Sequence, residues 1–437
     1  MTWLQRFRLR HYFVNSIWIE PLLSMMAALA AVPLLQQVEG AFQWGAVINP
    51  DAARALLGTM ASAMFSFIVF VSSALLVAVQ LASAQLTPRI IAIVFRDPRT
   101  KFALALFVFT FTFTLDVLVR IDASVPPLTS RLAAYGCLAN LGVFLYLIDH
   151  VCRTLRPSGA LHLVALMGRD VIESVYPMRL VEVHHALREP PATLEGNLNA
   201  TVTALTDGVI LAVDVQGLVA MAQRNNCVIE MIPKVGDFVA TGDPLFRVFG
   251  SQASLSADTL RQSIAMGQER TMEQDPAFAF RIIVDIASKG LSPAINDPTT
   301  AVLAIDQIHH LLRNVGSRYL DDERVRDAAG RVRLVYRTPA WDDFVQLAAT
   351  EIRHFGGESI QVARRLRAML ENLIQTLPEE RVPVLRQELA LLRRSAERFF
   401  PEPEDRALAE VSDMQGVGSK SGQQESAGDD VSRKDLR

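Results

Sequence analysis

The first third of the chain contains four apolar segments, each long enough to cross a lipid bilayer as a helix. A hydrocarbon core of about 30 Å needs roughly 20 apolar helical residues. The segments are about Ile17–Leu35, Met60–Leu86, Phe102–Val119 and Leu132–Val151. Lipid offers backbone amides no partner, so each segment is predicted to be a helix. We expect residues 1–152 to form an N-terminal interfacial arm and a four-helix transmembrane domain.

Lysine and arginine residues gather on one side of these spans, which predicts the orientation of the chain. One side carries Arg6, Arg8, Arg10, Arg89, Arg96, Arg99, Lys101, Arg153 and Arg156. The other side carries Arg54, Arg120 and Arg131. Because cytoplasmic loops hold the excess of basic residues, both termini are expected in the cytoplasm, in a multi-pass topology.

Composition argues against nucleic-acid binding and against a disulfide framework. The formal net charge is −3, so there is no electrostatic case for nucleic-acid binding. The three cysteines (Cys137, Cys152 and Cys227) form no CxxC motif. A disulfide framework is therefore not expected, and the water-facing part is predicted to lie in a reducing compartment.

The second span carries small and polar residues on one face. At 100° per residue, Ser62, Ser66, Ser73, Gln80 and Thr87 fall within a sector of about 60°. Such a stripe allows helices to approach closely and hydrogen-bond across their contact. Alternatively it lines a water-filled path, which requires an oligomer or a gap among the four helices. Both interpretations stay open at this point.

The third span contains an ionisable pair, Asp116 and Arg120, near its outer end. Alternating Phe and Thr residues over 107–114 suggest a strand, but a lone strand cannot span a bilayer, so a helix is predicted. Intramembrane carboxylates are costly and often functional. The alternative is an Asp116–Arg120 pair at the membrane interface.

A connecting helix and linker are expected over residues 153–200, followed by a small β-rich module over 201–250. Two glycine turns within Pro233–Val248 bracket a short apolar segment and precede a strand. This stretch resembles half of a biotinyl/lipoyl-type barrel-sandwich domain. The Met-Lys-Met-like hairpin that carries the prosthetic group in such domains is missing, so no cofactor is expected.

The remaining chain reads as a helical cytosolic domain over residues 251–400 and a disordered tail over 401–437. The tail is rich in Pro, Glu, Gly, Ser and Gln. The predicted fold class is thus a membrane α-helical protein with four transmembrane helices. To these is joined a cytosolic α+β region, consisting of the small β-barrel-like module and a helical C-terminal domain.

The densest group of polar motifs lies at the start of the helical domain. Arg281, Asp285 and Lys289 are spaced i, i+4 and i+8, which places them on one helix face. Asp275-Pro276 and Asp297-Pro298 each read as an N-cap aspartate before a first-turn proline. The candidate ligand or coupling site comprises Glu269, Arg270, Asp275, Arg281, Asp285, Lys289, Asn296, Asp297 and Thr299.

This run resembles the uncharacterised bacterial membrane-protein family known as domain of unknown function 2254. The similarity rests on Glu-Arg-Thr from Glu269, Gln-Asp-Pro from Gln274 and Leu-Ser-Pro-Ala-Ile-Asn-Asp-Pro from Leu291. Gln85-Leu86-Thr87-Pro88-Arg89, at the exit of the second span, is also similar, and the resemblance extends over residues 10 to 400. It implies a bacterial inner-membrane protein and no particular activity. Gly290 departs from the alanine expected there.

Two functions of different classes follow as hypotheses. In the first, the protein is an oligomeric channel- or transport-like assembly with a cytosolic regulatory domain. The alternative is a membrane-anchored ligand sensor or scaffold without transport activity. No catalytic motif, such as GxSxG, a P-loop or HExxH, is present, so no enzyme and no metal site are expected. The expected partners are the lipid bilayer, further copies of the chain and an unidentified ion or ligand.

Overall fold

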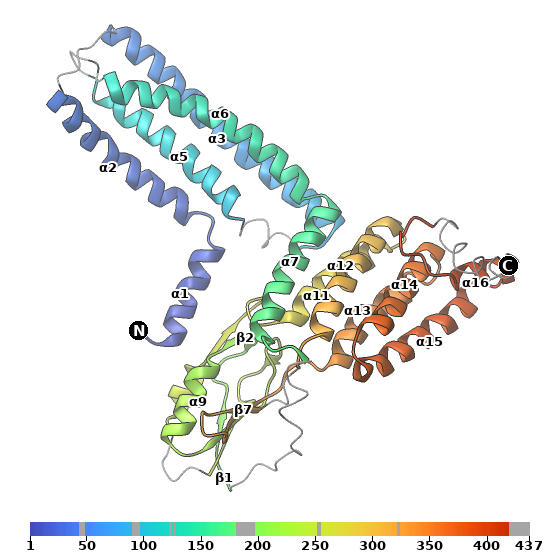
Figure 1. Cartoon of the computed structure of the whole chain (residues 1–437). Coiled ribbons are helices and arrows are strands. Elements are labelled where there is room, and N and C mark those ends of the chain that lie inside the picture. Colours follow the sequence, from blue (N-terminus) through green and yellow to red (C-terminus); the bar gives the residue numbers. More distant parts are fainter. Residues whose placement is uncertain are drawn as a thin grey trace, which may run out of the picture. The chain divides into compact units, whose positions relative to one another are not determined.

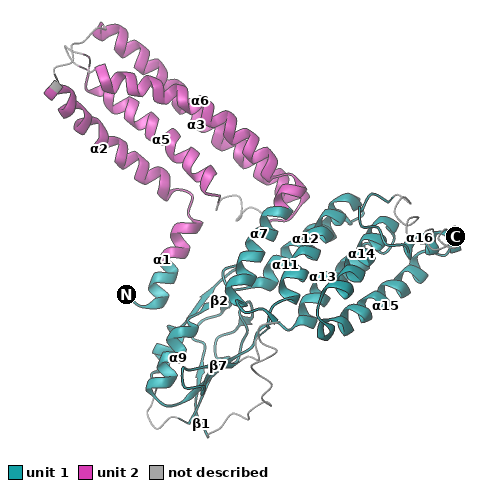
Figure 2. Cartoon of the chain, in the orientation of Figure 1, with its two compact units in different colours: residues 1–8, 161–437 teal, residues 9–160 magenta. Residues whose placement is uncertain are grey.

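The structure, a computed structural model, describes residues 1–42, 49–89, 97–121, 125, 127–180, 197–250, 255–320 and 324–418. The chain divides into two compact units (Figure 2). The membrane unit consists of residues 9–160, and the sheet-and-helix unit consists of residues 1–8 and 161–437. Each unit is described by itself below.

The membrane unit contains four helices that are long and apolar enough to cross a bilayer. They are α2 (Ile19–Phe42), α3 (Pro50–Gln85), α5 (Pro98–Val119) and α6 (Pro127–Thr154). The prediction of four long apolar helices is therefore confirmed. Asn49 and Asp97 cap α3 and α5, and a proline follows each cap. The Asn49 cap places the start of α3 at Pro50, ten residues before the predicted apolar span. The 36-residue helix is therefore about 54 Å long and exceeds the hydrocarbon core.

Helix α5 packs against each of the other three spans (Figure 1). Its Phe107 and Phe113 are buried in two apolar clusters, one shared mainly with α3 and α6 and the other also with α2. The alternating Phe and Thr residues thus lie on a helix, as predicted. Gly136 of α6 lies against Thr110, where a methyl group would sit 3.1 Å from the threonine Cγ2.

The sheet-and-helix unit contains two sheets. Strands β1 (Leu198–Thr203), β5 (Pro244–Phe249), β3 (Val228–Met231), β8 (Val332–Tyr336) and β7 (Arg324–Arg326) form the larger sheet in that order. Strands β4 (Phe238–Val239), β2 (Gly208–Val213) and β6 (Ile264–Gly267) form the smaller one. All neighbours are antiparallel except β3 and β8.

The predicted boundaries of the β-rich module were too narrow. Strands β6, β7 and β8 come from the region expected to be helical, and β8 adds buried Leu334 to the core of the module. Charged arginines at 331 and 333 make this segment look unlike a buried strand in the sequence. In the structure Arg333 is nevertheless buried, because it pairs with Asp327. Neither sheet closes into a barrel among the described strands, so the barrel is not confirmed. The two glycine turns, at Gly236 and Gly242, both have positive φ as such turns require.

Helices complete this unit. Helix α9 (Val215–Arg224) and the short α10 (Ala257–Arg261) lie between strands of the two sheets in the chain. Five longer helices then lie side by side (Figure 1): α11 (Pro276–Gly290), α12 (Pro298–Gly316), α13 (Trp341–Phe355), α14 (Ile360–Thr376) and α15 (Val382–Phe399). A 3-10 turn, η1 (Glu379–Arg381), precedes α15. Helix α7 (Pro157–Val175), expected from its amphipathic pattern, contacts α11 through Gly168.

Both ends of the chain differ from the prediction. The helix α1 (Trp3–Asn15) begins in the sheet-and-helix unit, because Trp3, Leu4 and Phe7 pack against Leu211, Ala212 and Ala265 of the small sheet. The interfacial arm is therefore not wholly part of the membrane domain.

The expected tail is structured at its start. It forms α16 (Pro403–Ala409) and a turn in which the Asp413 carboxylate accepts hydrogen bonds from three backbone amides. Buried Arg364 donates to the Val411 and Gly418 carbonyls, which holds this segment on α14. Residues 419–437 and the linker residues 181–196 lie outside the described part.

Candidate functional site

The polar stripe of the second span lies on the exposed face of α3. Ser62, Ser66, Ser73 and Gln80 are all exposed. The α3 residues buried against the other spans are Ala53, Leu57, Ala61, Met64, Val71, Leu75, Val79 and Ala82. At 100° per residue these two sets occupy nearly opposite sides of the helix. The stripe therefore faces away from the other three spans of the chain.

Thr87 does not continue the stripe, which corrects the prediction. Helix α3 ends at Gln85, and Thr87 is buried in the segment that follows. Ser66 donates its hydroxyl to the Ser62 carbonyl at 3.1 Å, so it is satisfied within the helix. The Ser66 hydroxyl oxygen remains able to accept a hydrogen bond on the exposed side of the helix.

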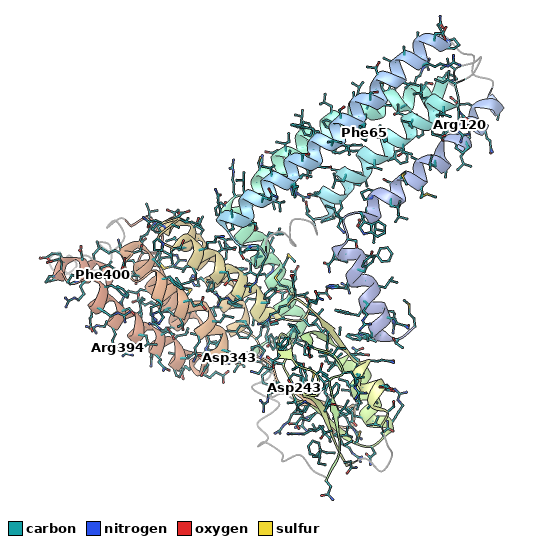
Figure 3. The ribbon with its side chains drawn as sticks, turned by 180° about the vertical axis from the view of Figure 1, so that it is seen from behind. Phe65, Arg120, Asp243, Asp343, Arg394 and Phe400 are labelled. Carbon is teal, nitrogen blue, oxygen red and sulfur yellow. The ribbon has the colours of Figure 1, made fainter. Side chains whose placement is uncertain are left out.

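Asp116 and Arg120 form an ion pair at the end of α5; Figure 3 labels Arg120 there. The Arg120 Nε donates to the Asp116 Oδ1 at 2.9 Å, and Arg120 is the C-cap of the helix. The arginine side chain is 40% exposed and the aspartate 12%. A cation at a helix C-terminus is favourable because of the helix dipole. This arrangement favours the interfacial pair over a carboxylate that acts alone within the membrane.

Two buried charges of the membrane unit were not among the predicted site residues. The Lys101 ammonium donates to Glu20 at 3.0 Å and to two backbone carbonyls that precede α2. Glu39 accepts from the backbone amide of Thr129 at 3.0 Å and thereby caps α6. Glu39 lies just beyond the expected end of the first span, and this position was the one sequence signal that could have marked it as a candidate. Which amides it meets depends on the packing of α2 against α6.

Arg270, which is partly exposed, forms an ion pair with buried Asp275 at the start of α11. Asp275 accepts from the Phe278 amide at 3.2 Å, so the predicted N-cap is present. Burial raises the pKa of the Asp275 carboxyl, although Arg270 acts in the opposite direction. A methyl group on Gly236 would lie 2.5 Å from the Asp275 Oδ2, so the glycine turn closes over this pair. Glu269 beside it is exposed.

Arg281 connects α11 to α13. It pairs with Asp285 one turn later, as the spacing predicts, and its two terminal nitrogens donate to both Glu351 oxygens at 2.6 Å. The Arg281 guanidinium lowers the pKa of the Glu351 carboxyl. Lys289 is half-buried in the last turn of α11. Glu351, which the sequence reasoning missed, carries no local signal because it lies 70 residues away.

Asn296, Asp297 and Thr299 form the turn into α12. Asn296 adopts a left-handed conformation with φ of 48°. Asp297 accepts from the Thr300 amide at 3.1 Å and from its hydroxyl at 2.6 Å, which makes it the predicted N-cap. Thr299 itself is exposed.

The nine candidate residues are thus distributed over three places along α11. A 15-residue helix is about 22 Å long, so its two ends cannot contribute to one small-molecule pocket. Asp275 and Asp297 already bind amides at the N-termini of α11 and α12, where an anion would otherwise bind. The cluster therefore connects helices and turns, and Arg281 with its two carboxylates is its most connected member.

Both units of the chain are similar in sequence to known proteins. The family model described as "Predicted membrane protein (DUF2254)" matches residues 14–372. Uncharacterized proteins of Mycobacterium bovis and Mycobacterium tuberculosis are 26% identical to this chain over 427 residues, which covers 91% of the chain and 79% of each relative. No solved structure matches. The family match spans all four candidate membrane helices and the cluster around Arg281, so this chain belongs to the DUF2254 family of predicted membrane proteins.

Proposed function

We propose that this protein is an oligomeric channel- or transport-like assembly of the bacterial inner membrane, regulated by its sheet-and-helix unit, and that it is not an enzyme. The carrying observation is the exposed polar stripe of α3, formed by Ser62, Ser66, Ser73 and Gln80. Ser66 donates within the helix, but exposure of the Gln80 amide to lipid is unfavourable, because hydrocarbon offers it no hydrogen-bond partner. Several copies arranged around α3 would direct the stripe towards a shared polar path.

The packing within one chain narrows the possible path. The stripe lies opposite the face that contacts α5 and α6, so a gap among the four helices of one chain would not include it. A path along the stripe therefore requires neighbouring copies. The proposed transport activity therefore depends on oligomerisation.

The proposed orientation has both termini in the cytoplasm. Two independent features support it: the excess of lysine and arginine on one side of the spans, and the contact of Trp3, Leu4 and Phe7 with the small sheet. The contact requires the N-terminus and the sheet-and-helix unit to share one side of the membrane.

The test is ion flux through protein reconstituted into lipid vesicles. Replacing Ser66, Ser73 and Gln80 together by leucine removes the polar groups from the stripe. We expect flux to fall by about tenfold or more, which corresponds to a barrier increase of about 1.4 kcal/mol. Ser72→Leu is the matched control, because Ser72 is exposed on the same helix about 80° or more away from the stripe.

Three outcomes of the flux measurement would count against parts of the proposal. Vesicles that remain tight to monovalent and divalent ions across pH and voltage would reject the transport proposal. Equal losses in the triple variant and in Ser72→Leu would show that added bulk, not lost polarity, is responsible. Unchanged flux in the triple variant would remove α3 from the path.

A further inference from the structure

The sheet-and-helix unit contains a cleft of about 610 Å³ that shares only Asp275 with the candidate residues described above. Its walls come from the end of α7, the connection between β2 and α9, the segment before α11, and the connection between β8 and α13. Trp3 of α1, Val235 and Val325 of β7 also line it. We refer to it as the α7–β8 cleft. Its volume is within the range of small-molecule sites, which is about 300–1,000 Å³.

The lining of the α7–β8 cleft combines apolar and aromatic side chains with few charges. Trp3 and Tyr336 provide aromatic rings, and Val213, Val325 and Pro339 provide aliphatic surface. Such walls suit a planar, largely apolar ligand body, because aromatic rings and aliphatic groups stack on flat molecules at little entropic cost.

The lining of the cleft includes one arginine that can pair with an anionic group. Its two carboxylates are already engaged: Asp214 accepts from the Gly217 amide at 2.9 Å, and Asp275 pairs with Arg270. Arg337 is the one lysine or arginine among the lining residues, and it is exposed. It forms no ion pair with any residue in the described part of the chain. Its guanidinium is therefore available for a carboxylate or a phosphate.

We propose that the α7–β8 cleft binds a small molecule that has an aromatic or otherwise apolar body and one anionic group. The anionic group pairs with Arg337, and the body lies between Trp3 and Tyr336. This inference does not rest on transport activity, because it concerns binding alone.

The position of the cleft along the chain gives such binding a consequence. Trp3 belongs to α1, which leads into the first span, and Ser174 to Pro177 end α7, which follows the last span. A bound ligand contacts both connections at once. Occupancy of the cleft therefore restrains the two segments through which the sheet-and-helix unit joins the membrane unit.

The test measures binding to the full-length protein in lipid nanodiscs by isothermal titration calorimetry. The probes are indole-3-acetate and adenosine 5′-monophosphate, which distinguish a carboxylate from a phosphate. Their neutral counterparts are indole-3-acetamide and adenosine. We expect at least one anion to bind, and its neutral counterpart to bind about tenfold more weakly or worse. Arg337→Gln should abolish that difference.

Two further variants complete the design. Arg331→Gln is the matched control, because Arg331 is exposed six residues earlier and does not line the cleft. It should bind as the wild type does. Thr338→Trp fills the cleft from a half-buried position and should abolish binding without changing the circular dichroism spectrum. The proposal is overturned if neither anion binds, if the neutral molecules bind equally well, or if Arg337→Gln and Arg331→Gln behave alike.

Discussion

Arg281 is the residue through which two helices of the sheet-and-helix unit are paired by charge. Its fork-like geometry matches the Glu351 carboxylate with two hydrogen bonds of 2.6 Å, while Asp285 contacts the same guanidinium from within α11. Such bidentate pairs carry orientation as well as energy. Because Glu351 is 39% exposed, solvent screens the pair and limits its contribution to stability.

We predict that Glu351→Gln lowers the free energy of unfolding by about 1 kcal/mol or less at pH 7. The pKa of Glu351 is lowered by Arg281, so this stabilisation is present above the ordinary pKa of 4.5 and is lost as the pH falls through the lower folded-state value. Chemical unfolding at pH 7 and at about pH 3.5 measures it. The wild-type and variant curves should lie closer together at the lower pH than at pH 7.

The control for this experiment is Glu397→Gln. Glu397 is 50% exposed and lies 3.8 Å from Arg393, so its loss should have a smaller effect than loss of Glu351. A difference between wild type and Glu351→Gln that persists unchanged at low pH would show that the pair is not the cause.

Local patterns predicted residue contacts within about four positions of each other. The i, i+4 spacing predicted the Arg281–Asp285 pair, and the Asp-Pro motifs predicted the caps at Asp275 and Asp297. Glu351 could not be predicted in this way. Its position opposite Arg281 depends on how α11 packs against α13, which the sequence of neither helix specifies.

At the scale of elements, the contact between α7 and α11 depends on one glycine. A methyl group on Gly168 would lie 2.6 Å from the Ala279 Cβ, which is closer than two carbon atoms can approach. The absence of a side chain at this position thus allows the two helices to touch. Since α7 follows the last span, this contact anchors the start of the sheet-and-helix unit.

We predict that Gly168→Ala destabilises the protein by about 1–3 kcal/mol through overpacking, despite the better helix propensity of alanine. The midpoint of thermal unfolding in nanodiscs measures this effect. Gly142→Ala is the control, because a methyl group at that helical glycine meets no atom within 4 Å. It should leave the midpoint unchanged or raise it. A stable Gly168→Ala variant would mean that α7 adjusts freely on α11.

Elements with a strong periodic or apolar signal were predictable, and those assembled from distant segments were not. The four spans and the glycine turns at Gly236 and Gly242 follow from local sequence. Strand β8 does not, because Leu334 becomes a core residue only when β8 pairs with β3, about a hundred residues earlier in the chain. The exposed side of α3 was also beyond sequence reasoning, since either face of that helix offers apolar residues for packing.

At the scale of the whole molecule, the stripe of α3 predicts how copies meet. In an assembly around a shared axis, residues of the stripe from neighbouring copies approach one another. We predict that Ser73→Cys, in a chain whose three native cysteines are replaced by alanine, forms disulfide-linked dimers of the 48.3 kDa chain in native membranes. Non-reducing gel electrophoresis after mild oxidation detects them.

Ser72→Cys provides the comparison for that cross-link. It is one residue away and exposed, but it points about 100° away from Ser73 around the helix. Cross-linking of Ser72→Cys with equal efficiency would indicate random collision in the membrane. Monomers alone in both variants would count against an assembly centred on α3.

The packing of the first residues on the small sheet also has a consequence for biosynthesis. Trp3, Leu4 and Phe7 meet Ala265 of β6, which leaves the ribosome roughly 260 residues later, or about 15 to 50 s at 5–20 residues per second. All four spans are synthesised within that interval. The contact of the amino terminus with the small sheet can therefore form only after all four spans and β6 have been synthesised.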